Sequence, residues 1–234
     1  MSRSLLLAGM SVHLEAPPPV TEYLRPWLAD LPATHGVRFR RAQVPKGRFA
    51  HSSLAVDIER NAATVEYTDE NALEAARAAL RLAAICWTLD SGGLALHAAS
   101  ARHAEGVVVF AGPAGSGKST FARQLEPLDD DFVLLRKGEN WFRPQMLDVN
   151  DPQRLLPGKP PDLPVLAVLL PDRDADGLER LEGARAVAGC LHVPPCWRDY
   201  GRLLGAAAAL ARSVPVARIG WRVPLAGALR ELLR

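Results

Sequence analysis

The segment from residue 112 to residue 119 constrains the fold of this chain more than any other part of its sequence. It reads Gly-Pro-Ala-Gly-Ser-Gly-Lys-Ser and matches the pattern G-x-x-x-x-G-K-[ST]. The apolar run 107–110 before it is typical of a buried strand, and residues 120–125 after it are typical of a helix. A strand, a glycine-rich loop and a helix in this order predict backbone N–H groups that face a bound phosphate chain.

The residues of this loop have distinct expected roles. Glycines let the backbone turn so that its N–H groups converge on an anion. We expect Lys118 to reach the β- and γ-phosphates of a nucleotide and Ser119 to hold Mg²⁺. The predicted nucleotide-binding residues are Gly112, Pro113, Ala114, Gly115, Ser116, Gly117, Lys118, Ser119 and Thr120.

Two acidic positions are candidates for the carboxylate that a phosphate loop needs for Mg²⁺. The first is the triplet Asp129, Asp130 and Asp131, which follows the predicted loop helix; a solvated acidic turn is the plainer interpretation of that triplet. The second is Asp172, which follows the apolar run 165–170. The residue pattern leaves both positions open.

Composition limits the classes of partner. The chain has 234 residues, with 28 basic and 26 acidic residues and a net charge of +2, and this balance predicts no nucleic-acid or membrane-surface partner. No apolar run is long enough for a membrane-spanning helix. Three cysteines without a C-x-x-C pair favour reduced thiols in a cytoplasmic protein. Cys190, His192 and Cys196 lie close together, but their spacing matches no zinc pattern.

Apolar periodicity predicts a strand-rich part over residues 1–69 and a phosphate-loop core over residues 70–234. The expected helices cover residues 20–31, 71–89, 198–212 and 224–233, and the expected strands cover 5–7, 11–15, 54–58, 63–67, 94–101, 132–135, 165–170 and 214–219. Residues 140–143 are expected to return antiparallel to the strand 132–135. Residues 144–164 contain six prolines and are predicted to form an irregular loop, with a lid over the site as one alternative.

Several of the predicted strands adjoin one another with no helix between them. This order does not fit a plain βαβαβ repeat, in which each strand is followed by a helix. The sequence therefore predicts the α/β class, with a phosphate-loop core inside a mixed, largely strand-rich sheet and with helices beside it.

Residues 94–136 resemble a known family of enzymes. Three segments carry the likeness around the loop: Leu-His-Ala-Ala-Ser at 96–100, Val-Val-Val-Phe-Ala-Gly at 107–112 and Asp-Asp-Phe-Val-Leu-Leu at 130–135. They are similar to the catalytic core of bacterial HPr kinase/phosphorylase. The closer likeness is to HPr-kinase-related proteins encoded with peptide-modification genes, which include serine kinases of ribosomally made precursor peptides such as lasso peptides.

The resemblance implies roles for particular residues. It makes Asp130 the catalytic base, Asp131 its neighbour on the Mg²⁺ side, and His97 a histidine next to the site, with Lys118 and Ser119 as described. It implies a core like the C-terminal domain of HPr kinase, and an ATP- and Mg²⁺-dependent kinase acting on a serine or threonine of a peptide or small protein. Because the HPr enzyme is a hexamer, it also implies that this chain can form a homo-oligomer.

Two other functions are compatible with the same residues. One is a small-molecule kinase, which would close a compact pocket around its acceptor. The other is a nucleotide-binding regulatory or peptide-docking module without turnover. An extended groove or a free sheet edge near the acids would favour a peptide acceptor over a small molecule.

The chain also departs from the HPr enzyme. Ala114 stands where that enzyme has a serine, and Thr120 stands where it has a glutamate. No counterpart of its later histidine-arginine-glycine signature, which goes with dephosphorylation of phosphoserine, follows residue 136. These differences argue against HPr as the acceptor and against phosphorolysis.

Overall fold

The fold is seen in a computed structural model that describes most of the chain. The described residues are 4–7, 10–25, 28–29, 32–42, 49–51, 54–59, 61–68, 72–104, 106–130, 132–137, 142–145, 163–191 and 200–234. They form two compact units, with the break between Asp90 and Ser91.

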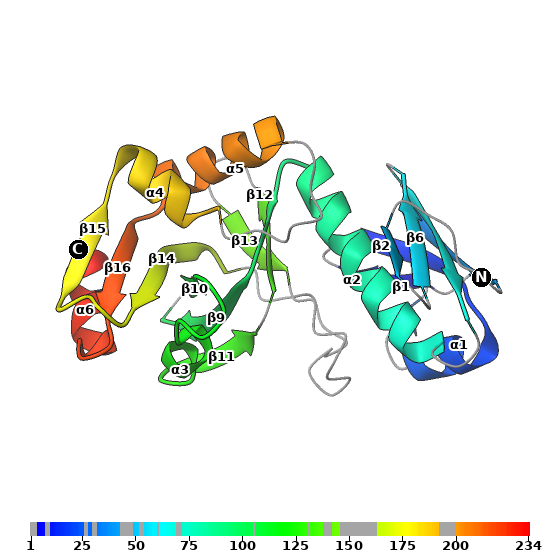
Figure 1. The fold of residues 1–234 in the computed structure, drawn as a ribbon, viewed down its shortest axis with the longest axis horizontal. Coiled ribbons are helices and arrows are strands. Elements are labelled where there is room, and N and C mark those ends of the chain that lie inside the picture. Colours follow the sequence, from blue (N-terminus) through cyan, green and yellow to red (C-terminus); the bar gives the residue numbers. More distant parts are fainter. Residues whose placement is uncertain are drawn as a thin grey trace. The chain divides into compact units, whose positions relative to one another are not determined.

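The first unit is a sheet of seven described strands with two helices (Figure 1, blue to cyan). Its elements are β1 (Ser4–Leu7), β2 (Met10–Glu15), α1 (Pro18–Leu24), β3 (Leu28–Ala29), β4 (His35–Arg41), β5 (Phe49–His51), β6 (Leu54–Ile58), β7 (Ala62–Tyr67) and α2 (Ala72–Asp90). The strand order is β3-β1-β2-β4-β7-β6-β5. β4 pairs in parallel with β2 and β7, and the predicted strands 54–58 and 63–67 form an antiparallel hairpin as β6 and β7.

The helix α2 confirms the predicted helix over residues 71–89 and is the long helix of this unit. Its apolar residues recur at three- and four-residue spacing, and it packs against β6, β7 and α1. Trp87 is 1% exposed, and its indole N–H donates a hydrogen bond of 3.0 Å to the Glu59 carbonyl. The ring of His35, at the start of β4, lies 4.5 Å from the Trp87 ring.

The second unit contains the glycine loop and a mixed sheet of six described strands. Its elements are β8 (Leu94–Leu96), β9 (Ala98–His103), β10 (Gly106–Ala111), α3 (Lys118–Ala122), β11 (Glu126–Asp129), β12 (Val133–Lys137), β13 (Phe142–Gln145), β14 (Val165–Asp172), β15 (Leu178–Leu181), α4 (Gly183–Gly189), α5 (Tyr200–Ser213), β16 (Val216–Gly220) and α6 (Leu225–Leu232). The order of the main sheet is β11-β9-β10-β14-β16-β15. β14 pairs in parallel with β10 and β16, and the outer strands pair antiparallel.

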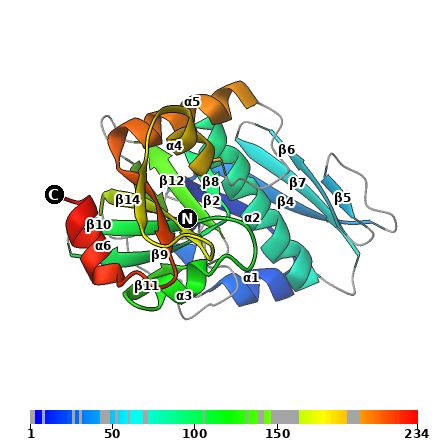
Figure 2. The ribbon, with the colours of Figure 1, turned by 60° about the vertical axis from the view of Figure 1, so that its left-hand side comes forward.

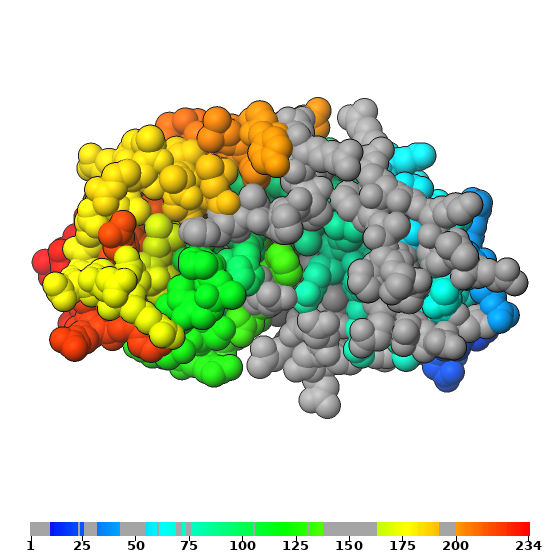
Figure 3. Space-filling model, in the orientation of Figure 1, coloured from blue at the N-terminus to red at the C-terminus, as the bar shows by residue number. Residues whose placement is uncertain are grey.

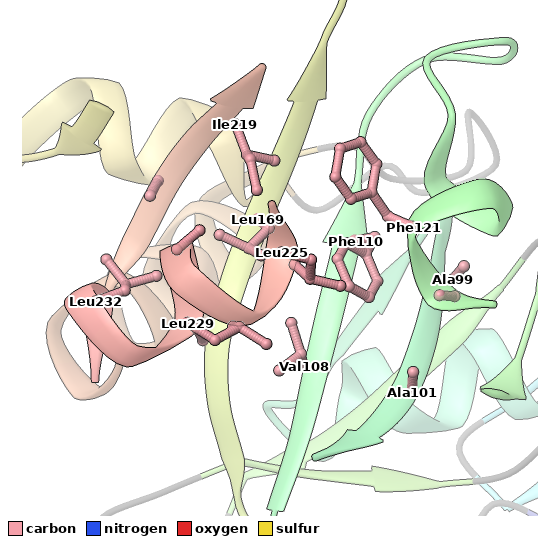
Figure 4. Close-up of a cluster of buried hydrophobic side chains, with 14 residues drawn as sticks. Ala99, Ala101, Val108, Phe110, Phe121, Leu169, Ile219, Leu225, Leu229 and Leu232 are labelled. Carbon is pink, nitrogen blue, oxygen red and sulfur yellow. The ribbon is translucent and has the colours of Figure 1, made fainter. Parts of the chain in front are cut away.

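Helices lie on both faces of this sheet (Figures 1 and 2). α3 and α6 share one face, where their apolar side chains meet those of β9, β10, β14 and β16. Phe121 of α3 stacks on Phe110 of β10 with ring centroids 6.0 Å apart, and Leu225, Leu229 and Leu232 line α6 towards the sheet (Figure 4). α4 and α5 pack against each other on the other face. The observed fold class is therefore α/β, with a mixed sheet and helices beside it.

Some predicted elements differ from the structure. The predicted helix over 20–31 ends at Leu24, because Pro26 lacks the N–H that a longer helix needs, and β3 follows at Leu28. The predicted strand 94–101 is two strands in different sheets, since β8 pairs with β12 and β9 pairs with β10. β12 and β13 form the expected antiparallel pair in a three-stranded sheet with β8.

The division into compact units also differs from the expected boundary at residue 69. The break comes after α2 rather than before it, because α2 packs on the strands of the first unit. The interior of the predicted proline-rich loop, residues 146–162, lies outside the described residues.

Among the described helices, none has the length and apolar character needed to cross a membrane.

We expect the stability of the first unit to depend on the protonation of His35. Burial lowers the pKa of His35 below its ordinary value of 6.5, so the unfolded chain takes up a proton at a higher pH than the folded chain does. The contribution of His35 to stability is therefore complete above pH 6.5 and is lost as pH falls below that value. Urea unfolding followed by circular dichroism should show a lower midpoint at pH 5 than at pH 7.5, and a smaller difference in His35→Gln. An equal pH dependence in the two proteins would contradict this assignment.

Candidate functional site

The candidate site lies at one edge of the six-stranded sheet, where the parallel strands end. β10, β14 and β16 run in the same direction, so the residues that follow them meet at this edge. The loop from Gly112 follows β10, Arg173 follows Asp172 at the end of β14, and Trp221 follows β16. Ligands of open α/β sheets bind at this end of the strands.

Two sequence-predicted residues reach the same edge from the antiparallel side of the sheet. Ala98, the first residue of β9, pairs with Ala111, the last residue of β10, so His97 lies beside the start of the loop. β11 also pairs with β9, and its last residue, Asp129, is opposite Ser100. The chain therefore returns to this edge at Asp130.

The glycine loop is held from outside by side chains that follow β14 and β16. The Trp221 indole N–H donates a hydrogen bond of 3.1 Å to the Ser116 carbonyl, and the Arg173 guanidinium donates one of 3.1 Å to the Gly115 carbonyl. Gly117 has φ +99°, and a Cβ added there would overlap the Trp221 ring. Glycine is thus required at residue 117 by both the backbone and its neighbour.

Lys118 lies across the loop. Its side chain is 6% exposed, and its Nζ donates a hydrogen bond of 2.9 Å to the Pro113 carbonyl. The ammonium group therefore lies inside the loop, where a phosphate bound by the loop would meet it. A buried ammonium group on a loop of this kind has the charge and the position needed for an anion.

Ser119 and Asp130 are brought together as the sequence predicts for residues of one site. The Ser119 Oγ donates a hydrogen bond of 2.7 Å to Asp130 Oδ1. The short α3 and the strand β11, which follows it after residues 123–125, place the acid beside the first turn of the helix. Asp130 is exposed, whereas Ser119 is half-buried, so the pair faces solvent.

The three acids of the predicted triplet have different surroundings. Asp129 is 4% exposed, and its backbone N–H donates a hydrogen bond of 3.2 Å to Ser100 Oγ, so it belongs to the sheet interior. Asp131, the predicted metal ligand, lies outside the described residues. His97 is half-buried, with its ring centroid 6.0 Å from that of Phe132.

Asp172 occupies the other side of the loop. One of its carboxylate oxygens accepts the Asp174 backbone N–H at 2.9 Å, and the other lies 3.5 Å from Arg218 Nε. Asp172, Arg173, Asp174 and Arg218 line a cavity of about 480 Å³ whose opposite wall is the glycine loop. Figure 3 shows the green part of the chain, which contains the loop, next to the yellow part, which contains the residues after β14.

The donor set suits a hard cation at Ser119. A hydroxyl and a carboxylate are the oxygen ligands that Mg²⁺ prefers, and it completes its shell with water and phosphate oxygens. Within the described ranges, no group of three or more histidines, cysteines, aspartates or glutamates could hold a metal by itself. Burial raises the pKa of Cys190 to about 12, which keeps this thiol neutral and unsuited to metal binding.

Among the site residues that were not predicted from the sequence are Arg173, Arg218 and Trp221. Arg173 and Trp221 immediately follow the strands β14 and β16, so the available signal was their position after two apolar runs. Arg218 lies inside β16, and no pattern in the sequence marks it.

No protein-family model and no curated protein sequence matches this chain. The assignment of its function therefore depends on the geometry of the site.

Gly115 and Gly117, two of the loop glycines with positive φ, should differ in their tolerance of a side chain. We expect Gly115→Ala to lower the free energy of unfolding by about 1–2 kcal/mol, since a Cβ at this φ of +76° meets open space and only the backbone cost remains. Gly117→Ala should cost more, because its Cβ also overlaps Trp221. Trp221→Ala in the Gly117→Ala background should recover part of the loss in urea unfolding. Equal losses for the two single variants would show that Trp221 does not restrict residue 117.

Proposed function

We propose that the second unit is an ATP- and Mg²⁺-dependent kinase that transfers a phosphoryl group to a hydroxyl, on a serine or threonine of a peptide or small protein. The observation that carries this proposal is the Ser119–Asp130 hydrogen bond of 2.7 Å beside a glycine loop that holds Lys118. Phosphate-binding, metal-binding and proton-accepting groups thereby lie within one short stretch of chain. The proposed core is a P-loop fold of the HPr-kinase type, in a cytoplasmic protein.

The loop supplies the phosphate site in this proposal. Backbone N–H groups of residues 112–119 hold the β- and γ-phosphates, and Lys118 exchanges its bond to the Pro113 carbonyl for phosphate oxygens. A lysine turned towards the phosphates is a charge-assisted donor, and its interaction grows as charge develops in the transition state.

The acids divide the remaining tasks. Ser119 and Asp131 hold Mg²⁺, which when bound neutralises charge on the β- and γ-oxygens. Asp130 accepts the proton of the attacking hydroxyl, and its contact with Ser119 keeps it next to the γ-phosphate position. His97, at the same edge of the sheet, is available to orient the acceptor or the phosphate.

The position of Asp130 favours a peptide acceptor over a small molecule. Asp130 directly follows β11, which is the edge strand of the sheet among the described strands. An extended peptide can pair with a sheet edge through its main chain and so carry a side-chain hydroxyl to a nearby group. The cavity of about 480 Å³ lies on the other side of the loop, beside Asp172 rather than Asp130.

Loss of Lys118 tests the phosphate site. Lys118→Ala should weaken ATP binding by about 1.5–3 kcal/mol, or roughly 10- to 150-fold, because a charge-assisted bond is removed. Transfer of labelled phosphate from ATP to a library of serine and threonine peptides should stop. Lys137→Ala, which removes an exposed lysine of β12, is the matched control and should leave both measurements unchanged. A folded Lys118→Ala protein with normal transfer would refute the kinase.

Comparison of two acids tests the catalytic base. Asp130→Asn keeps the shape of the side chain and removes its charge, so ATP binding should persist while transfer falls by about 10²–10⁴-fold. Asp172→Asn should retain transfer at saturating ATP, since Asp172 bonds to Arg218 and the Asp174 backbone on the other side of the loop. The reverse pattern, with Asp172→Asn inactive and Asp130→Asn active, would make Asp172 the essential carboxylate.

A further inference from the structure

The two sides of the glycine loop differ in chemistry. Lys118, Ser119 and Asp130 mark the side where phosphates and Mg²⁺ are proposed to lie. On the other side, the cavity of about 480 Å³ has a wall with two aspartates and two arginines, and its lining includes the apolar residues Leu170 and Pro171. Its volume is within the range of small-molecule sites.

The carboxylates of this cavity argue against a phosphate chain there. Asp172 and Asp174 would repel phosphate, and Arg218 is already engaged with Asp172 at 3.5 Å and with Glu179 at 3.8 Å. An uncharged group with hydroxyls and a flat ring suits such a lining better, because carboxylates accept hydrogen bonds from hydroxyls. The nucleoside half of a nucleotide has this chemistry.

Arg173 has the geometry of a stacking surface. Its guanidinium carbon lies over the Trp221 ring, 4.9 Å from the ring centroid, as in a cation–π contact. Arg173 lines the cavity, while Trp221 is not part of the lining. Arg173 therefore contacts the indole and also borders the cavity, where its guanidinium can meet a flat ligand. Guanidinium planes stack on nucleic-acid bases as well as on aromatic rings.

Trp221 fixes the orientation of this plane. Its indole N–H is bonded to the Ser116 carbonyl, and its ring packs edge-to-face on Phe121 with centroids 6.4 Å apart. The Arg173 bond to the Gly115 carbonyl fixes the guanidinium from the other end. Both side chains are thus attached to adjacent peptide groups of the loop, and the stacking surface keeps a constant position relative to the phosphates.

We propose that Arg173 is the base-stacking residue of this site: the nucleoside of the bound nucleotide lies in the cavity between the loop and residues 170–174, with its base against the guanidinium that covers Trp221. This proposal depends on the proposed nucleotide-binding function. Stacking does not read the edge of a base, so Arg173 contributes similarly to the binding of ATP and GTP.

The test is calorimetric binding of ATP, GTP and inorganic tripolyphosphate, each with Mg²⁺, to the full chain. The affinity for tripolyphosphate measures the contribution of the loop alone. The additional affinity for ATP measures the contribution of the nucleoside. In the wild type we expect ATP to bind about tenfold more tightly than tripolyphosphate, with GTP within about threefold of ATP, in line with the usual strength of base stacking. Lys118→Ala should weaken all three ligands.

Arg173→Lys is the decisive variant, because it keeps the charge and removes the plane. We expect it to lose the tenfold advantage of ATP while tripolyphosphate binding stays within about twofold of wild type, as for loss of one stacked base. Arg230→Ala, which removes a guanidinium bonded to a carbonyl of its own helix α6, is the control and should change neither ligand. Persistence of the ATP advantage in Arg173→Lys would overturn the proposal. An equal loss for both ligands would also overturn it, since Arg173 would then only shape the loop.

The wild-type measurements separate this proposal from the one it depends on. Suppose that tripolyphosphate binds in a way that depends on Lys118, and that ATP binds no more tightly. This result would support the phosphate site at the loop and would reject the stacking site. Failure of the wild type to bind either ligand would reject both.

Discussion

The parallel pairing of β10 with β14 and of β14 with β16 is the constraint on which the site depends. Hydrogen bonds between these strands fix their direction and register, so Phe110 is opposite Leu169, and Asp172 is opposite Gly220. The chain therefore leaves all three strands at one edge, where their partial charges and side chains meet. α3 and α6 cover one face of these strands, and that apolar layer keeps the edge rigid beneath the loop.

The sequence was most informative where apolar residues repeat with one clear period. The helix α2 and the strands β6 and β7 were predicted within a residue or two of their ends, because their buried faces follow the helix and strand periods. Short elements gave weaker signals: β11 has four residues, and one of them is Pro127. The break at His97 could not be predicted, since the apolar run through it is continuous and only pairing with different partners separates β8 from β9.

The same distinction applies to the candidate site. The loop, Lys118 and Ser119 are contiguous and carry a pattern, so the sequence places them together. The acidic triplet 129–131 was predicted from its closeness along the chain, and the family resemblance singled out Asp130, which the structure brings to Ser119. Arg173 and Trp221 are 58 and 105 residues from their partners in the loop, and tertiary pairing alone brings them to it. The catalytic roles of these residues remain predictions. The observed contacts give the positions of Lys118, Ser119 and Asp130 relative to the loop.

The bonds from Trp221 and Arg173 to the loop have a consequence for its internal side. A trans peptide group is planar, and its carbonyl and N–H point in opposite directions. Because the Ser116 carbonyl is held outward by the indole, the N–H of Gly117 is directed towards the interior of the loop. The conformational entropy lost in orienting this donor is thus spent when the chain folds rather than when a ligand arrives. An anion would meet a surface already arranged for it, and the affinity of the loop would be set in part by an indole that the anion never touches.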